Sequence, residues 1–548
     1  MKVLEAVSAA VATEGLDHLF GVMGDANQDL IVTLGEAHGV KFVHAHHEAS
    51  AVGMADGFAR FSGKPGLASV TQGPGYTNAT TSLVAARLHR TPLLLLAGHA
   101  SLRDPYNPQG MVDQHALARL TTEATVKLDS EKKVDYCLGE AFRQLKARRG
   151  PFVLNLPQDI QQSQMPSEDW EYKPMYKSNP IAIPRDEDLA AAVRVLATAK
   201  RPAILCGLGA VNAKAEPEVR KLAEFLGAPL ATSLYAAGFC AGYPLYLGIS
   251  GGLSSAVAAE ILAASDVLIV VGASLNEWTT RFGKILGNGK KIIQIDDRPD
   301  AFGWFARVDI GLAGDAKVSA TSLLERLQAA GKPRPVDPKT AQQLKNHKPE
   351  VVTYDDGSSI DPRRAARYLE DKLPKQDRIL VLDGGHAAMV CAQTLTISRA
   401  EDWGSGFDFG AIGQGLAIAI GACFARPGKR VTHVTADASF MMNVADFHTA
   451  VRHKLPLTVF VFNDNAVGQE RHDLVHKKLN PCYAELQQPD FAKLAAGFGA
   501  KGFTVTRPDD LGEVDKALAL QDGPVIVDIR INGAIELPIS AEIAKHLS

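Results

Sequence analysis

The chain has 548 residues, of which 46% are hydrophobic and 22% charged, and its formal net charge at pH 7 is −3. One hydrophobic core does not normally extend over this length, so roughly three or four domains are expected. The nearly balanced charge argues against a nucleic-acid or acidic-lipid partner.

The six cysteines are scattered without CxxC spacing, which indicates buried thiols in a reducing compartment. Apolar runs such as 92–97 and 266–272 are too short to span a bilayer. No uninterrupted apolar segment follows Met1, so no signal peptide is expected. These features predict a cytoplasmic protein with no membrane partner.

Residues 1–163 alternate short apolar strands with helices. The expected strands are Leu19–Val22, Gly66–Val70, Pro92–Ala97 and Phe152–Leu156, and the expected helices are Glu48–Phe61 and Thr77–His89. This alternation predicts a parallel sheet with helices on both faces.

Two polar, proline-containing stretches, 161–185 and 332–359, are predicted to be linkers. The block between them has strands expected at Ala203–Cys206, Val267–Val271 and Lys291–Ile295. The last block has them at Ile379–Leu382, Val431–Thr435, Leu457–Phe462 and Val525–Ile529. The predicted fold class is therefore α/β, with three doubly wound parallel-sheet domains at 1–163, 186–330 and 360–548. The first and third domains could share a fold, although the sequence alone does not show it.

Acidic residues follow two neighbouring strands of the last block. Asp437 comes after the apolar run that starts at Val431, and Asp464 comes after Leu457–Phe462. Parallel strands end at one edge of a sheet, where ligands bind, and carboxylates combined with phosphate oxygens suit Mg²⁺. Ala438 and Ser439 would leave backbone N–H groups open to an anion. The alternative is two ordinary turns of a buried sheet.

The segment Ala436-Asp437-Ala438, with Asn463-Asp464 one strand later, resembles the motif of thiamine-diphosphate-dependent enzymes. The family usually has Gly-Asp-Gly and then Asn-Asn, so both glycines are alanines here and Asp464 replaces an asparagine. The extra negative charge leads us to expect that Asp464→Asn is tolerated or improves Mg²⁺ binding. The resemblance covers essentially the whole chain, in the acetolactate synthase, benzaldehyde lyase and benzoylformate decarboxylase branch.

The run HHEASAVGMADGFAR, from His46, resembles the conserved glutamate segment of that family. The resemblance implies that Glu48 holds a proton against N1′ of the aminopyrimidine, with a pKa raised by burial. The residues alone leave two alternatives. Glu48 could simply favour a helix N-terminus, or His44, His46 and His47 could bind a metal, although their spacing matches no common motif.

The run VTQGPGYTNATTSL, from Val70, resembles the family's Gly-Pro-Gly loop, which implies that Gln72 faces the thiazolium or the substrate. The alternative is a turn capped by Thr77. Gly24-Asp25-Ala26-Asn27 resembles a segment in which Asp25 is an acid/base, but Asp25 could equally cap the next helix. His115 is a weaker candidate proton donor, and a structural role is an alternative.

The last block carries two further segments that resemble this family, at residues 382–386 and 407–422. The resemblance implies that the Gly410 carbonyl accepts a hydrogen bond from the 4′-amino group and that Ile412 is an apolar wedge under the cofactor, with ordinary core as its alternative. It also implies metal ligands at Asp437, Asp464 and the Ala466 carbonyl. The implied diphosphate-side residues are Gly384, Gly385, His386, Ala438, Ser439 and Gln469.

The central block holds only a fragment of a dinucleotide fingerprint, Gly207-Leu208-Gly209-Ala210, while Gly272–Leu275 and Asp296-Asp297 could touch a nucleotide. Relatives bind FAD or ADP in this domain, or nothing. The sequence does not favour FAD.

The resemblance implies a thiamine-diphosphate- and Mg²⁺-dependent 2-oxo-acid decarboxylase or carboligase. Such an enzyme forms an enamine and then an aldehyde or a 2-hydroxy ketone, and this chain is most like acetolactate synthase. Alternatives are a carbon–carbon lyase of the benzaldehyde lyase or oxalyl-CoA decarboxylase type, and a catalytically silent homologue acting as a subunit or regulator. The implied partners are a 2-oxo acid or aldehyde substrate and further copies of the chain, in a homodimer or homotetramer with active sites at the subunit interface.

Overall fold

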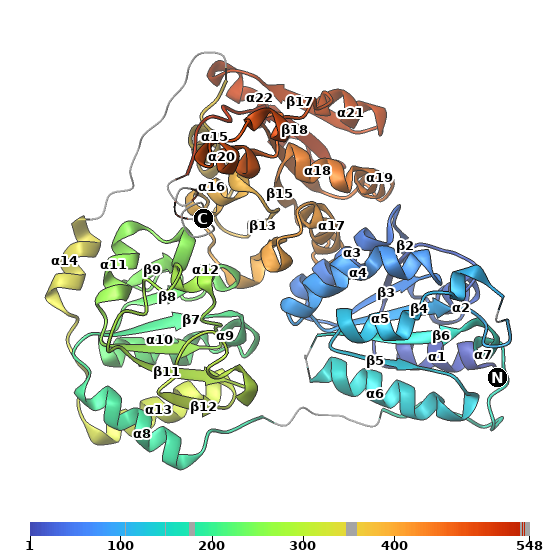
Figure 1. The fold of residues 1–548 in the computed structure, drawn as a ribbon, viewed down its shortest axis with the longest axis horizontal. Coiled ribbons are helices and arrows are strands. Elements are labelled where there is room, and N and C mark those ends of the chain that lie inside the picture. Colours follow the sequence, from blue (N-terminus) through green and yellow to red (C-terminus); the bar gives the residue numbers. More distant parts are fainter. Residues whose placement is uncertain are drawn as a thin grey trace.

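The computed structural model describes residues 1–104, 106–147, 150–174, 181–346 and 359–537, together with Ser540 and Glu542. Three six-stranded sheets are interleaved with helices, and every pairing between their strands is parallel (Figure 1). The predicted α/β fold class with three parallel sheets is confirmed. No helix in the described part of the chain is long and apolar enough to cross a membrane.

The N-terminal sheet has the order β2-β1-β3-β4-β6-β5. Its strands are β1 (His18–Gly21), β2 (Lys41–His44), β3 (Gly66–Val70), β4 (Leu93–His99), β5 (Ala124–Lys127) and β6 (Pro151–Pro157). Its helices are α1 (Val3–Thr13), α2 (Gln28–His38), α3 (Glu48–Ser62), α4 (Pro74–Leu88), α5 (Gln114–Thr121), α6 (Val134–Lys146) and α7 (Gln158–Gln161).

The central sheet has the order β12-β11-β10-β7-β8-β9. Its strands are β7 (Pro202–Cys206), β8 (Leu230–Thr232), β9 (Tyr246–Ile249), β10 (Val267–Val271), β11 (Lys291–Asp296) and β12 (Ile310–Ala313). The accompanying helices are α8 (Asp186–Thr198), α9 (Leu208–Asn212), α10 (Glu216–Leu226), α11 (Ala256–Ala264), α12 (Glu277–Thr280), α13 (Ala316–Ala330) and α14 (Pro338–Asn346).

The C-terminal sheet has the order β14-β13-β15-β16-β18-β17. Its strands are β13 (Ile379–Leu382), β14 (Trp403–Ser405), β15 (Val431–Ala436), β16 (Leu457–Asn463), β17 (Lys501–Val505) and β18 (Val525–Arg530). Its helices are α15 (Pro362–Lys372), α16 (His386–Thr394), α17 (Gln414–Ala425), α18 (Asp437–Met442), α19 (Phe447–Arg452), α20 (Gly468–His476), α21 (Phe491–Gly497) and α22 (Gly512–Leu518).

The N-terminal and C-terminal sheets share one topology. If each sheet's strands are numbered along the chain, both read 2-1-3-4-6-5. The chain direction across the sheet therefore reverses between the first and third strands of each, β1 and β3 in one and β13 and β15 in the other. Such a switch point opens a crevice at the carboxyl ends of the strands, where ligands bind.

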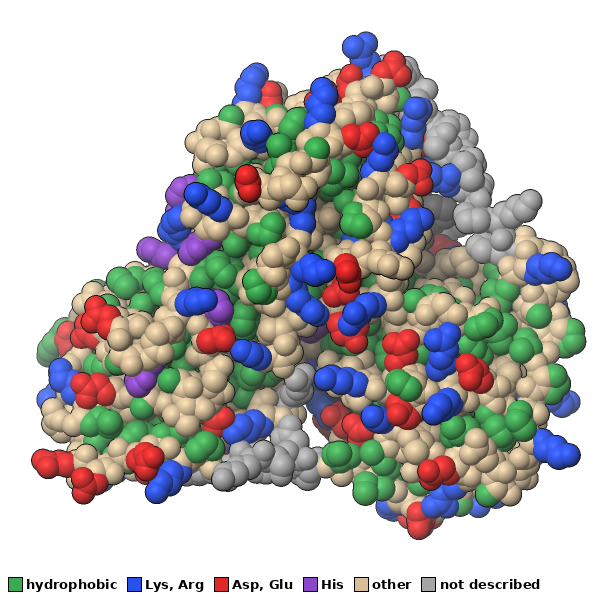
Figure 2. All heavy atoms as spheres, turned by 180° about the vertical axis from the view of Figure 1, so that it is seen from behind, with side chains coloured by type: hydrophobic (Ala, Val, Ile, Leu, Met, Phe, Trp, Pro, Cys, Tyr) green, Lys and Arg blue, Asp and Glu red, His purple; other side chains and the backbone are tan. Residues whose placement is uncertain are grey.

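These two sheets lie side by side because α3 packs across α17 (Figure 1). The helices approach so closely that a side chain at Gly57 would clash with the backbone of Ile418, and one at Gly421 with the backbone of Met54. Both helices contribute to a hydrophobic core that continues from one sheet to the other. On the face in Figure 2, acidic and basic side chains are interspersed among apolar ones, in keeping with the small net charge.

The structure adds elements that the sequence pattern did not predict. Edge strands β5, β9, β12 and β17 are short and half-exposed, so they lack the apolar runs of the inner strands. The predicted linker at 332–359 contains helix α14, while 347–358 lie outside the described residues. The linker prediction for 161–185 overlaps the end of α7, and 175–180 are likewise outside.

Candidate functional site

Asp383 ties two loops together at the C-terminal switch point. It follows β13 and is fully buried, and its Oδ1 accepts hydrogen bonds from the Gly384 N–H (2.7 Å) and the Gly413 N–H (2.9 Å). The Thr435 hydroxyl donates to its Oδ2 at 3.2 Å. Burial raises the pKa of Asp383 to about 6, although these hydrogen bonds oppose the rise. The loop after β13 and the loop before α17 are thereby held in one arrangement.

Asp437 begins α18 at the end of β15 and has no exposed surface. Among the described residues, neither carboxylate oxygen has a hydrogen-bond partner of normal geometry, although the Ala438 and Ala466 N–H groups lie near enough to lower the pKa. Burial first, and the charge of Asp464 second, raise the pKa of Asp437 to about 7. A buried carboxylate whose oxygens lack partners, next to a second buried carboxylate, suits a divalent cation, so this site fits the metal that the resemblance implies.

Asp464, after β16, is 4% exposed and forms a 2.8 Å ion pair with Arg471 of α20. Burial raises its pKa, while Arg471 and the Ala466 N–H oppose the rise. The Ala466 N–H therefore lies near the carboxylates of both Asp437 and Asp464. Metal binding by the Ala466 carbonyl stays a prediction. The sequence had given no sign of Arg471.

Several predicted diphosphate-side residues meet around the Gly384 loop. The Ser439 hydroxyl donates to the Gly384 carbonyl at 3.4 Å, and a Cβ at Gly384 would lie 2.8 Å from Ile412 Cγ2. Ile412 is half-buried rather than part of the closed core, and Gly410 is exposed with φ +67°. Next to Ser439, Ala438 is buried at the start of α18, while Gly385 precedes α16 with φ +105°.

His386 and Gln469 differ in their surroundings. His386 is buried, its Nε2 has no partner among the described residues, and burial lowers its pKa to about 4, so it is neutral at pH 7. A Cβ at Gly468 would lie 3.0 Å from His386 Nδ1 and 2.6 Å from Asp464 Oδ2. Gln469 instead contacts Asp473 and Ser540, with no described contact to the residues after β15.

At the N-terminal switch point, polar groups satisfy one another. The Thr71 hydroxyl donates to Asp25 Oδ1 at 3.1 Å, and Gln72 Nε2 donates to Asp25 Oδ2 at 2.9 Å and to Gln109 Oε1 at 2.7 Å. Gln72 is buried, and its Oε1 has no partner in the described structure. Asp25 is not the cap of α2, because Asn27 holds that position. Gln109, in a short 3-10 helix at Pro108–Gly110, carries no spacing signal in the sequence.

Glu48 begins α3 and is half-buried. The Asn78 amide donates to its Oε2 at 3.0 Å, and a Cβ at Gly75 would lie 3.6 Å from its Oε1. The Gly-Pro-Gly loop therefore lies against Glu48, as the resemblance implies. Thr77 does not cap α4, which starts at Pro74 after Gly73 with φ +60°; proline is favoured at the first position of a helix.

His115 lies away from this cluster. Its Nδ1 is 3.4 Å from the Thr125 hydroxyl and 3.5 Å from the Asn155 amide, and burial lowers its pKa. No described contact joins it to Asp25, Gln72 or Glu48. Of the other histidines, His46 meets His448 at 3.0 Å, and no group of three or more His, Cys, Asp or Glu in the described residues is arranged to bind a metal.

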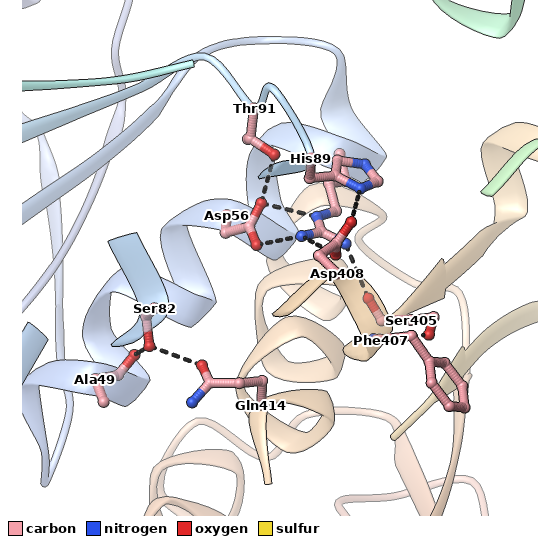
Figure 3. A network of polar contacts seen from close by, with 10 residues as sticks. Ala49, Asp56, Ser82, His89, Thr91, Ser405, Phe407, Asp408 and Gln414 are labelled. Carbon is pink, nitrogen blue, oxygen red and sulfur yellow. Dashed lines mark hydrogen bonds and ion pairs between the residues drawn. The ribbon is translucent and has the colours of Figure 1, made fainter. Parts of the chain in front are cut away.

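A buried ionic network joins the N-terminal and C-terminal blocks (Figure 3). Arg60 of α3 binds Asp56 through two hydrogen bonds of 2.7 and 2.6 Å and Asp408 at 3.0 Å, while His89 binds Asp408 at 2.9 Å. Burial alone would raise the pKa of Asp408, but Arg60 and His89 outweigh it and the net pKa is lowered. Because Asp408 lies two residues before Gly410, the network anchors the loop that the resemblance places against the cofactor.

The central glycines serve close approach between chain segments. A side chain at Gly207 would clash with Gly272 and Ala273, and one at Gly209 would lie 2.8 Å from the Gly272 Cα. The packing of β7 against β10 therefore accounts for these glycines without a nucleotide. Arg90 of the N-terminal block reaches Asp296 at 3.7 Å and Asp297 at 3.8 Å, so one nucleotide-side candidate pair contacts protein instead.

Comparison with known proteins agrees with this geometry. Three sequence models of thiamine pyrophosphate enzymes match the chain: the N-terminal TPP binding domain at residues 1–117, the central domain at 189–326 and the C-terminal TPP binding domain at 383–529. Together they span most of the chain, which belongs to the thiamine-diphosphate-dependent enzymes.

Full-length relatives narrow the branch. The chain is 29% identical to the probable acetolactate synthase large subunit of Methanocaldococcus jannaschii, over 98% of this chain and 93% of the relative. It is 28% identical to the acetolactate synthase isozyme 3 large subunit of Escherichia coli K12, over 97% and 95%. It is also 28% identical to the sulfoacetaldehyde acetyltransferase of Castellaniella defragrans, over 93% and 89%. The protein is thus an enzyme of the acetolactate synthase-like branch.

Proposed function

We propose that this enzyme uses thiamine diphosphate and Mg²⁺ to decarboxylate a 2-oxo acid and to release an aldehyde or join the fragment to a second carbonyl. The observation that carries the proposal is Asp437, whose buried oxygens lack partners beside Asp464 at a switch point. A cation held there together with a diphosphate would satisfy both carboxylates. The bound cofactor would supply the carbanion chemistry and the electron sink.

The chain's own residues would hold and orient that group. Asp437, Asp464 and the Ala466 carbonyl would bind the metal, and the Gly384–His386 loop with Ser439 would bind the diphosphate. Ile412 and the Gly410 carbonyl would position the pyrimidine end. The Asp383 bridge supports this assignment, because it fixes the first loop relative to Gly413, next to Ile412.

Glu48 would hold a proton against N1′ of the pyrimidine, with Asn78 fixing its carboxylate. Gln72 and Asp25 would face the substrate. Both Asp25 oxygens accept hydrogen bonds, from Thr71 and Gln72, which fix the orientation of its carboxyl group. His115, which has no described contact with these three, would act only on a more distant part of the substrate.

Glu48 and Asp437 are proposed to serve one cofactor from two subunits. The described partners of Glu48 all lie in its own block, and large apolar side chains near both half-sites are exposed: Met111 at 86%, Phe409 at 51% and Met442 at 60%. Exposed apolar groups of this kind mark interfaces. Light scattering on the purified chain should give a dimer or tetramer, and a monomer that binds cofactor fully would contradict this arrangement.

Calorimetric titration with thiamine diphosphate, with and without Mg²⁺, tests the cofactor assignment. Binding that requires the metal is expected; no binding in either titration would identify a silent homologue. Mass spectrometry of the cofactor adduct after incubation with pyruvate, benzoylformate, benzoin or an acyl-CoA then identifies the substrate class. An adduct with a 2-oxo acid supports the proposal, whereas one with benzoin or an acyl-CoA alone favours a lyase. Sulfoacetaldehyde belongs in the panel because one similar relative is named for it.

A further inference from the structure

Arg471 connects Asp464 of the candidate metal site to the segment that follows β18. Its guanidinium binds Asp464 Oδ2 at 2.8 Å and also donates to the carbonyl of Gly533, in the segment after β18. The side chain is only 18% exposed. A long cation held from two sides in this way has a fixed position, not that of a mobile surface arginine.

Glycines on both sides make room for this arrangement. A side chain at Gly533 would clash with the Arg471 guanidinium, and a Cβ at Gly468 would lie 2.6 Å from Asp464 Oδ2. The two glycines thus leave room for the pair, and its low exposure to solvent strengthens the electrostatic interaction. The site is built around the pair.

The Arg471–Asp464 pair changes the net charge next to Asp437. Without Arg471, Asp437 and Asp464 would place two negative charges at adjoining strand ends, where a diphosphate must also bind. With Arg471, the net charge of the three side chains is −1, the same as for Asp437 beside a neutral ligand. Such a site still attracts a divalent cation but repels a diphosphate less.

We propose that Arg471 is a positioning and charge-balancing residue of the metal site, which sets the net charge near Asp437 so that a divalent cation and a diphosphate bind together. It acts through Asp464 and not by contact with the metal. This inference rests on the proposed metal and diphosphate site and goes beyond it by assigning a role to a residue outside the ligand set. The inference also changes the expectation that Asp464→Asn is tolerated or improves Mg²⁺ binding. That substitution alone leaves the Arg471 guanidinium without its carboxylate next to the cation, so metal binding should weaken.

The test is a double-mutant cycle with Arg471→Met, Asp464→Asn and both together, on the full chain at pH 8. Two affinities are measured by calorimetry: Mn²⁺ alone, and thiamine diphosphate at saturating Mg²⁺. In Arg471→Met we expect Mn²⁺ to bind about tenfold tighter and the cofactor about tenfold weaker; in Asp464→Asn we expect Mn²⁺ to bind about tenfold weaker. The double variant restores the net charge, so both affinities should return to within about threefold of wild type.

Lys477→Met is the matched control, since it removes a cation from the exposed end of α20 and should change neither affinity. Gly533→Ala keeps the charge but displaces the guanidinium, and it should shift both affinities in the direction of Arg471→Met; it replaces that variant in the comparison if Arg471→Met does not fold. Unchanged affinities in Arg471→Met, or a double variant that keeps both shifts of Arg471→Met, would overturn the inference while leaving the proposed function intact. A wild-type chain that binds neither Mn²⁺ nor cofactor would overturn both.

Discussion

The N-terminal and C-terminal sheets have the same strand order and the same switch point, yet their strand ends carry opposite chemistry. In the segments after β1, β3 and β4, hydrogen bonds link Asp25, Thr71, Gln72 and Gln109. After β15 and β16, Asp437 and Asp464 are buried together and Asp437 has unsatisfied oxygens. The fold alone therefore does not determine what each crevice does.

The difference indicates which half needs a ligand. The N-terminal groups are largely satisfied by other groups of the protein. At the C-terminal switch point Arg471 pairs with Asp464, and the charge of Asp437 is left for a cation or a proton to offset. One topology thus carries two different sets of polar side chains, the N-terminal and C-terminal ends of the proposed site. The variants below alter either end or the connection between them.

Glu48→Gln should give the largest effect, confined to the N-terminal end. The amide retains the shape and the Asn78 contact but cannot hold a proton at N1′, so exchange of the cofactor's C2 proton should slow by about 100- to 10,000-fold. Hydrogen–deuterium exchange followed by NMR measures it. Cofactor affinity should change little, and Glu36→Gln, on exposed surface, serves as control. Exchange of the C2 proton at the wild-type rate would show that Glu48 does not have the proposed role at N1′.

Arg60→Met should break the connection between the two ends. It leaves Asp56 and Asp408 buried without their cation, and removing one partner of a buried pair costs about 3–5 kcal/mol of unfolding free energy. Urea unfolding should show this loss. The same substitution at Arg143, whose pair with Glu140 is exposed, should cost about 0–1 kcal/mol. Equal losses of unfolding free energy at Arg60 and Arg143 would mean that the buried ionic network does not stabilise the fold.

Asp437→Asn should act in opposite directions on the two forms of the protein. Without ligands it should raise the melting temperature, because a buried carboxylate without partners is replaced by a neutral amide. With Mg²⁺ present it should weaken cofactor binding by about 100-fold, or ~2.8 kcal/mol. Calorimetry and thermal melts at pH 8 measure both. A lower melting temperature together with retained cofactor binding would show that Asp437 is a structural residue.

Much of the fold was predictable because inner strands are short apolar runs. Strands β3, β10 and β13 have the predicted limits, since burial on both faces demands continuous apolar residues. The half-exposed edge strands β5 and β17 lack that signal. The strand order shared by the N-terminal and C-terminal sheets could not be predicted. Strand pairing joins residues far apart in the chain, and no local sequence pattern indicates it.

The candidate site divides in the same way. Asp437 and Asp464 were found because acidic residues directly after apolar strands must lie at the sheet edge. Arg471, Asn78 and Gln109 were missed, because they lie on helices and reach the site only through tertiary packing. The prediction of His115 remains without a described contact to the cluster.

Asp383→Asn should change stability without moving the loops, and it separates burial from ligand binding at the C-terminal end. The amide oxygen can still accept from Gly384 and Gly413, so the loops should stay in place. What disappears is a carboxyl group whose pKa burial raises from 3.8 to about 6. Because the folded state then holds this proton more tightly than the unfolded state, wild-type stability should fall as pH rises from about 4 to 6 and level off above that, by about 3 kcal/mol at most.

The measurement is the unfolding free energy of both proteins, without cofactor, from pH 4 to 8. Asp437 and Asp464 titrate in both, so the difference between variant and wild type isolates Asp383. It should grow in favour of the variant up to pH 6 and then stay constant. Asp25→Asn provides the comparison from the other sheet, because Asp25 also follows the first strand but is exposed. A difference for Asp383→Asn that is the same at every pH would mean that the pKa of this carboxyl group is equal in the folded and unfolded protein, so that its burial does not affect stability.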